Sequence, residues 1–267
     1  MKFAPWNLLR RLIQEANLVL EVIDVRDPIS TRSKRVEQLA KKLGKTVVII
    51  LNKCDLVPRR VASKWAEFFR KEGFRVIYIA AQKRMGTKIL KEFILEVASE
   101  LQRPVKIAVV GVPKVGKSTV INALKGKHSA STSPYPGSPG YTKGYQLLKI
   151  DEGVYLIDTP GIAPIECGGI EAEIRKRPIE QLSDPVPIAI ELMEKIRKYN
   201  PKAFERAYGI KEDNLERILE EIARRRGWFS KRDKEPLVEE AARTVIRDYF
   251  NGKIPFFIPP ETSRNKL

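Results

Sequence analysis

The stretch from Gly111 to Ser118 has the residue types and the spacing of a loop that binds phosphate. Its sequence fits the pattern G-x-x-x-x-G-K-[ST] without a gap, and it stands between an apolar run at 106–110 and a helical pattern. Backbone N–H groups and a helix N-terminus would face the phosphate. We expect Lys117 to reach the β- and γ-phosphates of a nucleotide and the Ser118 hydroxyl to ligate Mg²⁺. The nucleotide contacts predicted in this loop are Pro113, Lys114, Val115, Gly116, Lys117, Ser118 and Thr119.

A second motif could select the base. Asn52-Lys53-Cys54-Asp55 follows the predicted strand 46–51 and matches N-K-x-D. The Asp55 carboxylate can accept hydrogen bonds from both N1–H and N2–H₂ of guanine, whereas adenine would leave it unpaired. We expect Asn52 to tie this loop to the phosphate loop and the stem of Lys53 to lie across the base. The two motifs together predict a site for GTP or GDP.

A third segment, Ala80-Ala81-Gln82, follows the predicted strand 75–79. It resembles the S-A-K element of GTPases, in which the N–H of the middle residue donates to O6 of guanine. The motif is degenerate, so the assignment depends on its place at a strand end. We expect Ala80, Ala81 and Gln82 to contact the base, with Ala81 as the donor.

Two later segments could sense the γ-phosphate. Thr142 stands in a stretch rich in Ser, Pro and Gly, and is the natural second Mg²⁺ ligand. The predicted strand 154–157 is followed by Asp158-Thr159-Pro160-Gly161, a D-x-x-G element. Asp158 would hold the Mg²⁺ shell, and the Gly161 N–H would sense the γ-phosphate. The predicted Mg²⁺ ligands are therefore Ser118, Thr142 and Asp158.

Apolar periodicity indicates two kinds of architecture along the chain. Up to about residue 180, buried strands alternate with amphipathic helices, and the strands 145–150 and 154–157 flank a turn so tight that they must form an antiparallel hairpin. Beyond it the pattern is helical only, in four short segments that fit a small bundle. We predict an α/β fold with a three-layer nucleotide-binding domain over residues 1–180, and a small all-α domain over residues 181–267.

The order of the motifs is rotated, because the guanine-reading motif precedes the phosphate loop instead of following it. In this order the sequence resembles the circularly permuted GTPases of the YlqF/YawG group, which are ribosome-assembly factors. Their D-A-R-x-P segment stands here as Asp24-Val25-Arg26-Asp27-Pro28. The resemblance implies a P-loop G domain, GTP hydrolysis, and a C-terminal domain that contacts ribosomal RNA of the large subunit. Because the segment after D-x-x-G leads into the helical unit, the γ-phosphate could move that unit directly.

The residues for hydrolysis are less complete than those for binding. Ras-like enzymes place a water-orienting Gln directly after D-x-x-G, and Ile162 stands there. The single histidine, His128, is expected to be an exposed bystander. Lys114 replaces an Asn of potassium-activated relatives, so that its ammonium could supply the charge between the phosphates, or it could be a generic phosphate or RNA contact. The predicted catalytic residues are Lys117, Thr142, Gly161 and Lys114, with low basal turnover and help from the bound particle.

The net charge of +17 over 267 residues favours a nucleic-acid partner. Residues 1–180 contribute most of it, with 32 Lys and Arg against 18 Asp and Glu. In the helical part, Arg224-Arg225-Arg226 could contact RNA while Trp228 stacks on a base, or the arginines could favour a helix C-terminus while Trp228 packs in the core. The expected partners are the large ribosomal subunit and its rRNA, with no DNA and no membrane.

The termini and the two cysteines indicate neither a signal peptide nor a disulfide framework, and the longest uncharged apolar run, 46–51, is too short to span a bilayer. We therefore expect a cytoplasmic protein, and we expect it to be a monomer. Two other functions fit the same motifs. One is a GTP-gated RNA-binding module with negligible turnover, and the other is a signalling GTPase that acts on a protein effector.

Overall fold

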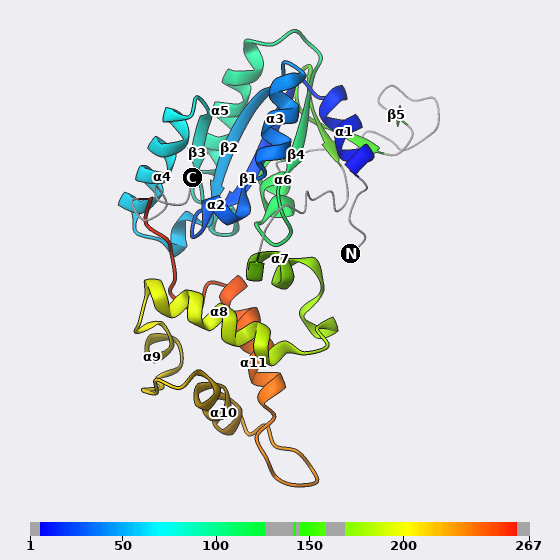
Figure 1. Cartoon of the computed structure of the whole chain (residues 1–267). Coiled ribbons are helices and arrows are strands. Elements are labelled where there is room, and N and C mark those ends of the chain that lie inside the picture. The colour runs from blue at the N-terminus through cyan, green and yellow to red at the C-terminus, as the bar shows by residue number, and fades with distance from the viewer. Residues whose placement is uncertain (1–5, 126–140, 143–144, 159–168, 261–267) are drawn as a thin grey trace. The chain divides into compact units, whose positions relative to one another are not determined.

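The computed structural model describes residues 6–125, 141–142, 145–158 and 169–260 (Figure 1). The chain divides into two compact units, and the division falls between Cys167 and Gly168. Among the described residues, the first unit contains the strands and the second is built of helices. None of the described helices is long and apolar enough to cross a membrane.

A seven-stranded sheet in the order β3-β2-β1-β4-β7-β6-β5 forms the centre of the first unit. The strands β3, β2, β1, β4 and β7 run parallel, and β6 and β5 complete the sheet in antiparallel pairings. Every residue of β1 is buried, as expected of a central strand covered on both faces. The bounds are β1 Leu18–Asp24, β2 Thr46–Asn52, β3 Arg75–Tyr78, β4 Val105–Val110, β5 Tyr141–Thr142, β6 Tyr145–Asp151 and β7 Val154–Asp158.

Helices pack on both faces of this sheet, so the predicted three-layer α/β fold is confirmed. One apolar core joins the sheet to α1 and α3, and the other joins it to α5 and α6. The helices of the unit are α1 Trp6–Glu15, α2 Pro28–Thr31, α3 Lys34–Lys42, α4 Arg59–Lys71, α5 Thr87–Ser99 and α6 Lys117–Lys125, with short 3-10 turns at Cys54–Leu56 and Ala81–Lys83.

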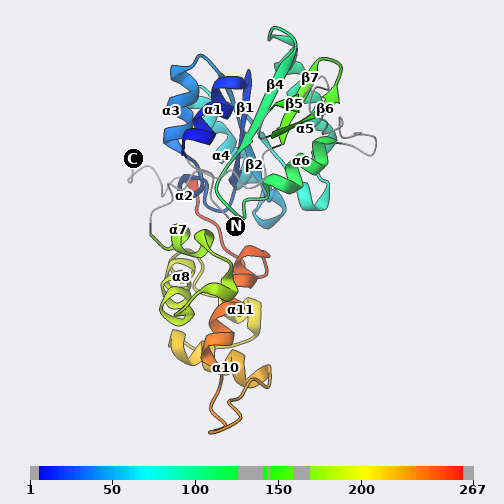
Figure 2. The same ribbon diagram turned by 90° about the vertical axis from the view of Figure 1, so that its right-hand side faces the viewer.

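The helical unit begins earlier than the sequence indicates. The predicted boundary lies at residue 180, whereas the compact units divide after Cys167, because Ile170, Ile174 and Ile179 are buried in the helical core. The four predicted helices are present, and α7 adds a fifth. Figure 2 shows α8 beside α11, and these two helices are in contact. The bounds are α7 Gly169–Lys176, α8 Pro185–Tyr199, α9 Ala203–Tyr208, α10 Leu215–Arg225 and α11 Val238–Phe250, with a 3-10 turn at Ile179–Gln181.

A buried carboxylate, Glu171, connects three of these helices. It is bound by Arg175 Nε at 2.8 Å, Lys195 Nζ at 2.8 Å and the Tyr249 hydroxyl at 2.6 Å. Burial by itself raises the pKa of Glu171, but the charges of Arg175 and Lys195 outweigh burial and lower it to about 2. The carboxylate is therefore ionised at neutral pH and holds α7 to α8 and α11.

Candidate nucleotide-binding site

The phosphate loop lies between β4 and α6, at the carboxyl edge of the sheet. Its backbone enters the left-handed region at Gly111, Lys114 and Gly116, with φ of 146°, 65° and 98°. A Cβ at Gly111 would lie 2.4 Å from the backbone oxygen of Val22, so only glycine fits there. Lys117 Nζ lies 3.0 Å from the Val112 carbonyl and so folds back over the loop. Its N-terminal position on α6 suits a group that binds phosphate.

Asn52, at the end of β2, joins the base-reading loop to the phosphate loop. Its Nδ2 donates to the Val115 carbonyl at 2.9 Å, which is the link that the sequence predicts. Its Oδ1 accepts from the Ala81 N–H at 3.1 Å. A Cβ at Gly116 would lie 2.3 Å from Nδ2, so the loops are as close as a glycine allows. One buried amide therefore holds three segments that are far apart in the sequence.

The contact with Ala81 differs from the sequence expectation. The Ala81 N–H was assigned to O6 of guanine, but in the structure it donates to Asn52. The physical reason is that Ala81 begins a 3-10 turn, which brings its N–H against the buried amide. The next N–H along this turn belongs to Gln82, whose side chain is exposed. The Ala81 N–H is thus engaged within the protein itself.

Lys53 is held by a buried charge cluster that the sequence did not reveal as part of the site. Its Nζ lies 3.0 Å from Asp24 Oδ2, and its backbone is left-handed with φ of 65°. Arg26 also binds Asp24 with both Nε at 3.0 Å and Nη2 at 2.7 Å. The side chains of Asp24 and Arg26 are each only 1% exposed. Asp24 pairs in register with Asn52, so the strand ends bring the cluster to the base-reading loop. The sequence signal for this cluster was Asp24, the charged residue that ends the buried strand, followed by Arg26.

The structure describes some of the remaining predicted site residues and not others. Cys54 and Asp55 begin the 3-10 turn after β2; burial, together with the charge of Asp55, raises the pKa of the Cys54 thiol. Ser118 and Thr119 occupy the first turn of α6. Thr142 belongs to β5 and Asp158 ends β7, the neighbour of β4 in the sheet. Gly161, Ile162 and His128 lie outside the described residues.

The described residues contain no group of three or more His, Cys, Asp or Glu side chains placed to hold a metal ion. A Mg²⁺ site of the predicted kind would need only one carboxylate, Asp158, because hydroxyl groups and the phosphates of the nucleotide would supply the other oxygens. Of its predicted ligands, Ser118 stands at the N-terminus of α6, beside Lys117. This is the position from which a hydroxyl reaches a metal on the β- and γ-phosphates.

A comparison with protein families decides the assignment. A model of the family described as RsgA GTPase matches residues 12–168, which contain every motif considered above. The chain belongs to the RsgA GTPase family. The order of its strands and motifs makes it a circularly permuted GTPase of the YlqF type, as the sequence predicts.

Individual relatives extend the likeness over nearly the whole chain. An uncharacterized GTP-binding protein of Methanocaldococcus jannaschii is 32% identical over 94% of this chain and 66% of its own length. Nucleolar GTP-binding protein 2 of Yarrowia lipolytica is 33% identical over 96% of this chain and 50% of its own length. The chain thus spans about half to two thirds of these relatives. The GNP-bound structure of YlqF from T. maritima matches with a TM-score of 0.69 and 28% identity, covering 94% of this chain and 96% of that one.

The arginine run of the helical unit is engaged by its own neighbours. Arg224 Nη2 lies 3.0 Å from Glu220, and Arg225 Nε lies 2.7 Å from Glu221. Arg225 also donates to the Tyr208 carbonyl at 2.9 Å. Trp228 is half-buried against the helical core, with the Arg226 guanidinium 5.7 Å from its ring centroid. These contacts favour the structural interpretation of Arg224, Arg225 and Trp228, and leave Arg226 as the more available cation for a phosphate.

Proposed function

We propose that this protein binds GTP and GDP with Mg²⁺, hydrolyses GTP to GDP and phosphate, and acts in assembly of the large ribosomal subunit through contact with rRNA. The main support for nucleotide binding is the pair of hydrogen bonds made by Asn52, because they hold the base-reading loop against the phosphate loop. Membership of the RsgA GTPase family supports the same activity.

The proposed roles follow the geometry of the loops. Lys117 and the loop N–H groups bind the phosphates, and Ser118, Thr142 and Asp158 serve Mg²⁺. Asp55 reads the guanine edge while the stem of Lys53 covers its face. Because the Ala81 N–H is engaged by Asn52, the N–H of Gln82 is the donor for O6.

Hydrolysis requires help in placing water and charge. Ile162 follows Gly161, and its side chain can neither donate nor accept a hydrogen bond, so it cannot orient the attacking water. Lys114, in the left-handed turn of the phosphate loop, supplies positive charge near the β–γ bridge. The rest of the transition-state stabilisation comes from the bound ribosomal particle, so basal turnover is slow.

Two observations support a ribosomal partner. The chain carries a net charge of +17, which suits the phosphates of RNA. Its relatives include nucleolar GTP-binding proteins of fungi, and the nucleolus is where eukaryotic ribosomal subunits are assembled. We propose that Arg226 contributes a phosphate contact from the helical unit.

Base selection by Asp55 is tested with the substitution Asp55→Asn. The variant loses two charge-assisted hydrogen bonds to guanine, so its affinity for GDP falls by at least about 100-fold. Xanthine carries a carbonyl in place of the N2 amine, so the amide N–H₂ of the new Asn can donate to it and affinity for XDP rises. Isothermal titration with GDP, XDP and ADP measures both changes.

The matched control is Asp151→Asn, which makes the same change at the exposed last residue of β6 and is expected to bind GDP like the original protein. The guanine assignment is wrong if Asp55→Asn retains its affinity for GDP, or if the unaltered protein binds ADP as tightly as GDP.

A further inference from the structure

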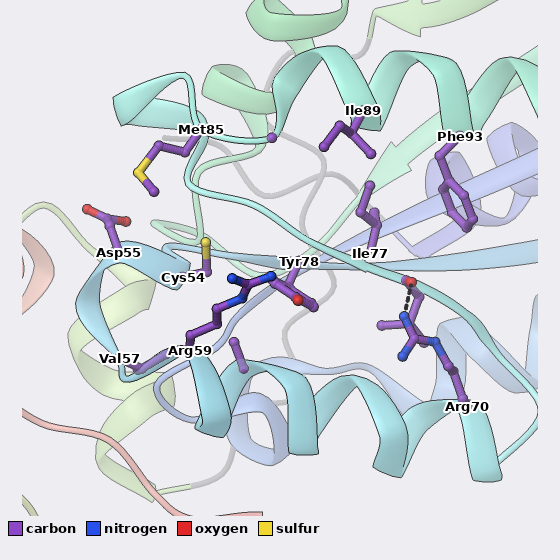
Figure 3. A pocket seen from close by; sticks show the side chains of 13 residues that line it. Cys54, Asp55, Val57, Arg59, Arg70, Ile77, Tyr78, Met85, Ile89 and Phe93 are labelled. Carbon is purple, nitrogen blue, oxygen red and sulfur yellow. Dashed lines mark hydrogen bonds between the residues drawn. The ribbon is translucent and has the colours of Figure 1, made fainter.

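A groove of about 720 Å³ lies in the nucleotide unit between α4 and α5, along the free side of β3 (Figure 3). One of its ends adjoins the base-reading loop, and from there it follows β3 away from the phosphate loop. No role described above uses it beyond that end. Its lining residues fall into three sets, which are the strand edge, an apolar side from α5 and a basic side from α4.

The outer edge of β3 presents backbone groups that do not pair with β2. Among the described strands, β3 is the last of the sheet and pairs with β2 alone. The Ile79 N–H donates to the Leu51 carbonyl of β2, so residues of the same parity face β2, and Val76 and Tyr78 face the groove. Arg70 donates to the Val76 carbonyl at 3.2 Å, which confirms that this group points outward. Such an edge can accept another strand.

The α5 side is apolar and exposed. Met85 and Ile89 are 54% and 63% exposed, the two highest values among the large apolar side chains described. Figure 3 shows Ile89 and Phe93 on the groove side of α5, above Ile77 of the strand. Adjacent exposed apolar side chains of this kind mark a surface that becomes covered.

The α4 side is basic. Arg59 and Arg70 extend from α4 toward β3 in Figure 3, and neither makes an ion pair within the described part of the chain. A second copy of the chain paired edge to edge would bring two such arginine sets together, which repulsion disfavours. A partner with acidic side chains would instead match them.

We propose that this groove docks an extended peptide segment of a partner protein, in which apolar and acidic residues alternate. Side chains of an added strand point alternately to the two faces of the sheet. Alternate positions would therefore meet Met85, Ile89 and Phe93 on one face and Arg59 and Arg70 on the other, while the backbone pairs with Tyr78. Only Cys54 and Asp55, at one end of the groove, belong to the proposed nucleotide site, and the proposed docking surface lies along the rest of it.

The test uses the synthetic peptide acetyl-Val-Glu-Leu-Glu-Phe-Glu-amide as the probe, titrated to millimolar concentration into the ¹⁵N-labelled full chain. Saturable chemical-shift changes are expected at Val76, Tyr78 and Ile89. Ile89→Asp and Arg59→Glu are each expected to weaken binding by at least about ten-fold. The control Arg60→Glu makes the same charge change on the neighbouring residue, which does not line the groove, and is expected to bind the peptide at least about three-fold more tightly than Arg59→Glu.

Several results would overturn the proposal. These are no saturable shift at millimolar peptide, equal loss in the Arg59 and Arg60 variants, and equal binding of a peptide with Lys in place of Glu. Light scattering tests the alternative that a second copy of the chain occupies the groove. A dimer of the full chain that Ile89→Asp dissociates would assign the groove to that second copy and contradict the proposal of a partner peptide.

Discussion

At the scale of single residues, Asn52 determines how the site is assembled. Its bond to the Val115 carbonyl could be predicted from the N-K-x-D motif, because that motif and the phosphate loop must serve one nucleotide. Its bond to the Ala81 N–H could not, because a degenerate three-residue element does not show its own register. The contact of Lys53 with Asp24 and Arg26 escaped prediction for a related reason, since it is the parallel pairing of β1 and β2 that brings Lys53 to Asp24.

The close approach of Asn52 and the phosphate loop predicts the effect of Gly116→Ala. The new Cβ would lie 2.3 Å from Asn52 Nδ2, in a backbone with φ of 98° that is unfavourable for alanine. The Asn52–Val115 bond breaks, and GDP affinity measured by titration calorimetry falls at least about ten-fold.

Gly44→Ala provides the matched control. Gly44 has a left-handed φ of 64° but nothing within 4 Å of its added Cβ. This change should cost about 1 kcal/mol of stability and leave GDP affinity unaltered. Normal GDP binding by Gly116→Ala would show that the loops do not depend on this contact.

The buried cluster predicts a large stability loss in Asp24→Asn. The substitution replaces the carboxylate that binds the Arg26 guanidinium, which is 1% exposed, by a neutral amide, and the loss of this buried charge pairing costs about 3–5 kcal/mol. Urea unfolding measures this loss. The control is Glu15→Gln, which removes one partner of the partly exposed Arg11–Glu15 pair and should change the free energy of unfolding by less than about 1 kcal/mol. Similar unfolding midpoints for the two variants would mean that the cluster is not a buried ion pair in solution.

At the scale of elements, the parallel strands were predictable because their apolar runs are continuous and end at polar motifs. The short helix α2 begins at Pro28, and Asp27 caps it by accepting from the Ser30 N–H. Helix α7 lies within residues 1–180, which the sequence assigned to the nucleotide-binding domain. Its membership of the helical core depends on long-range burial of Ile170 and Ile174, which a local pattern does not show.

Glu171 makes the stability of the helical unit depend on pH in the acid range. Its folded pKa of about 2 lies below its ordinary value of 4.5, so its contribution is complete above about pH 4.5 and is lost as pH falls toward 2. The shift corresponds to about 3 kcal/mol as an upper bound. Hydrogen-exchange protection of α7, α8 and α11 should therefore fall over this window.

Glu171→Gln should lower that protection at pH 7 and flatten its change with acid, because the neutral side chain does not titrate. Glu173→Gln changes an exposed neighbour on the same helix and should behave like the original protein. An unchanged pH profile in Glu171→Gln would exclude the buried carboxylate as its source.

At the scale of the whole molecule, the order of the motifs predicted a permuted GTPase, and the family comparison and the strand order agree. The particle on which the protein acts is a proposal, because it depends on surface chemistry and on relatives longer than this chain. The central claim is that GTP turnover serves assembly of the large ribosomal subunit, with part of the catalytic power supplied by the particle.

The most direct measurement is steady-state GTP turnover by the full chain, titrated with purified large and small ribosomal subunits at one fixed salt concentration. The account predicts slow basal turnover and saturable stimulation by the large subunit alone. Stimulation by neither subunit would contradict it in favour of a GTP-gated binder or a protein-effector switch, and stimulation by the small subunit would show that the assigned particle is wrong.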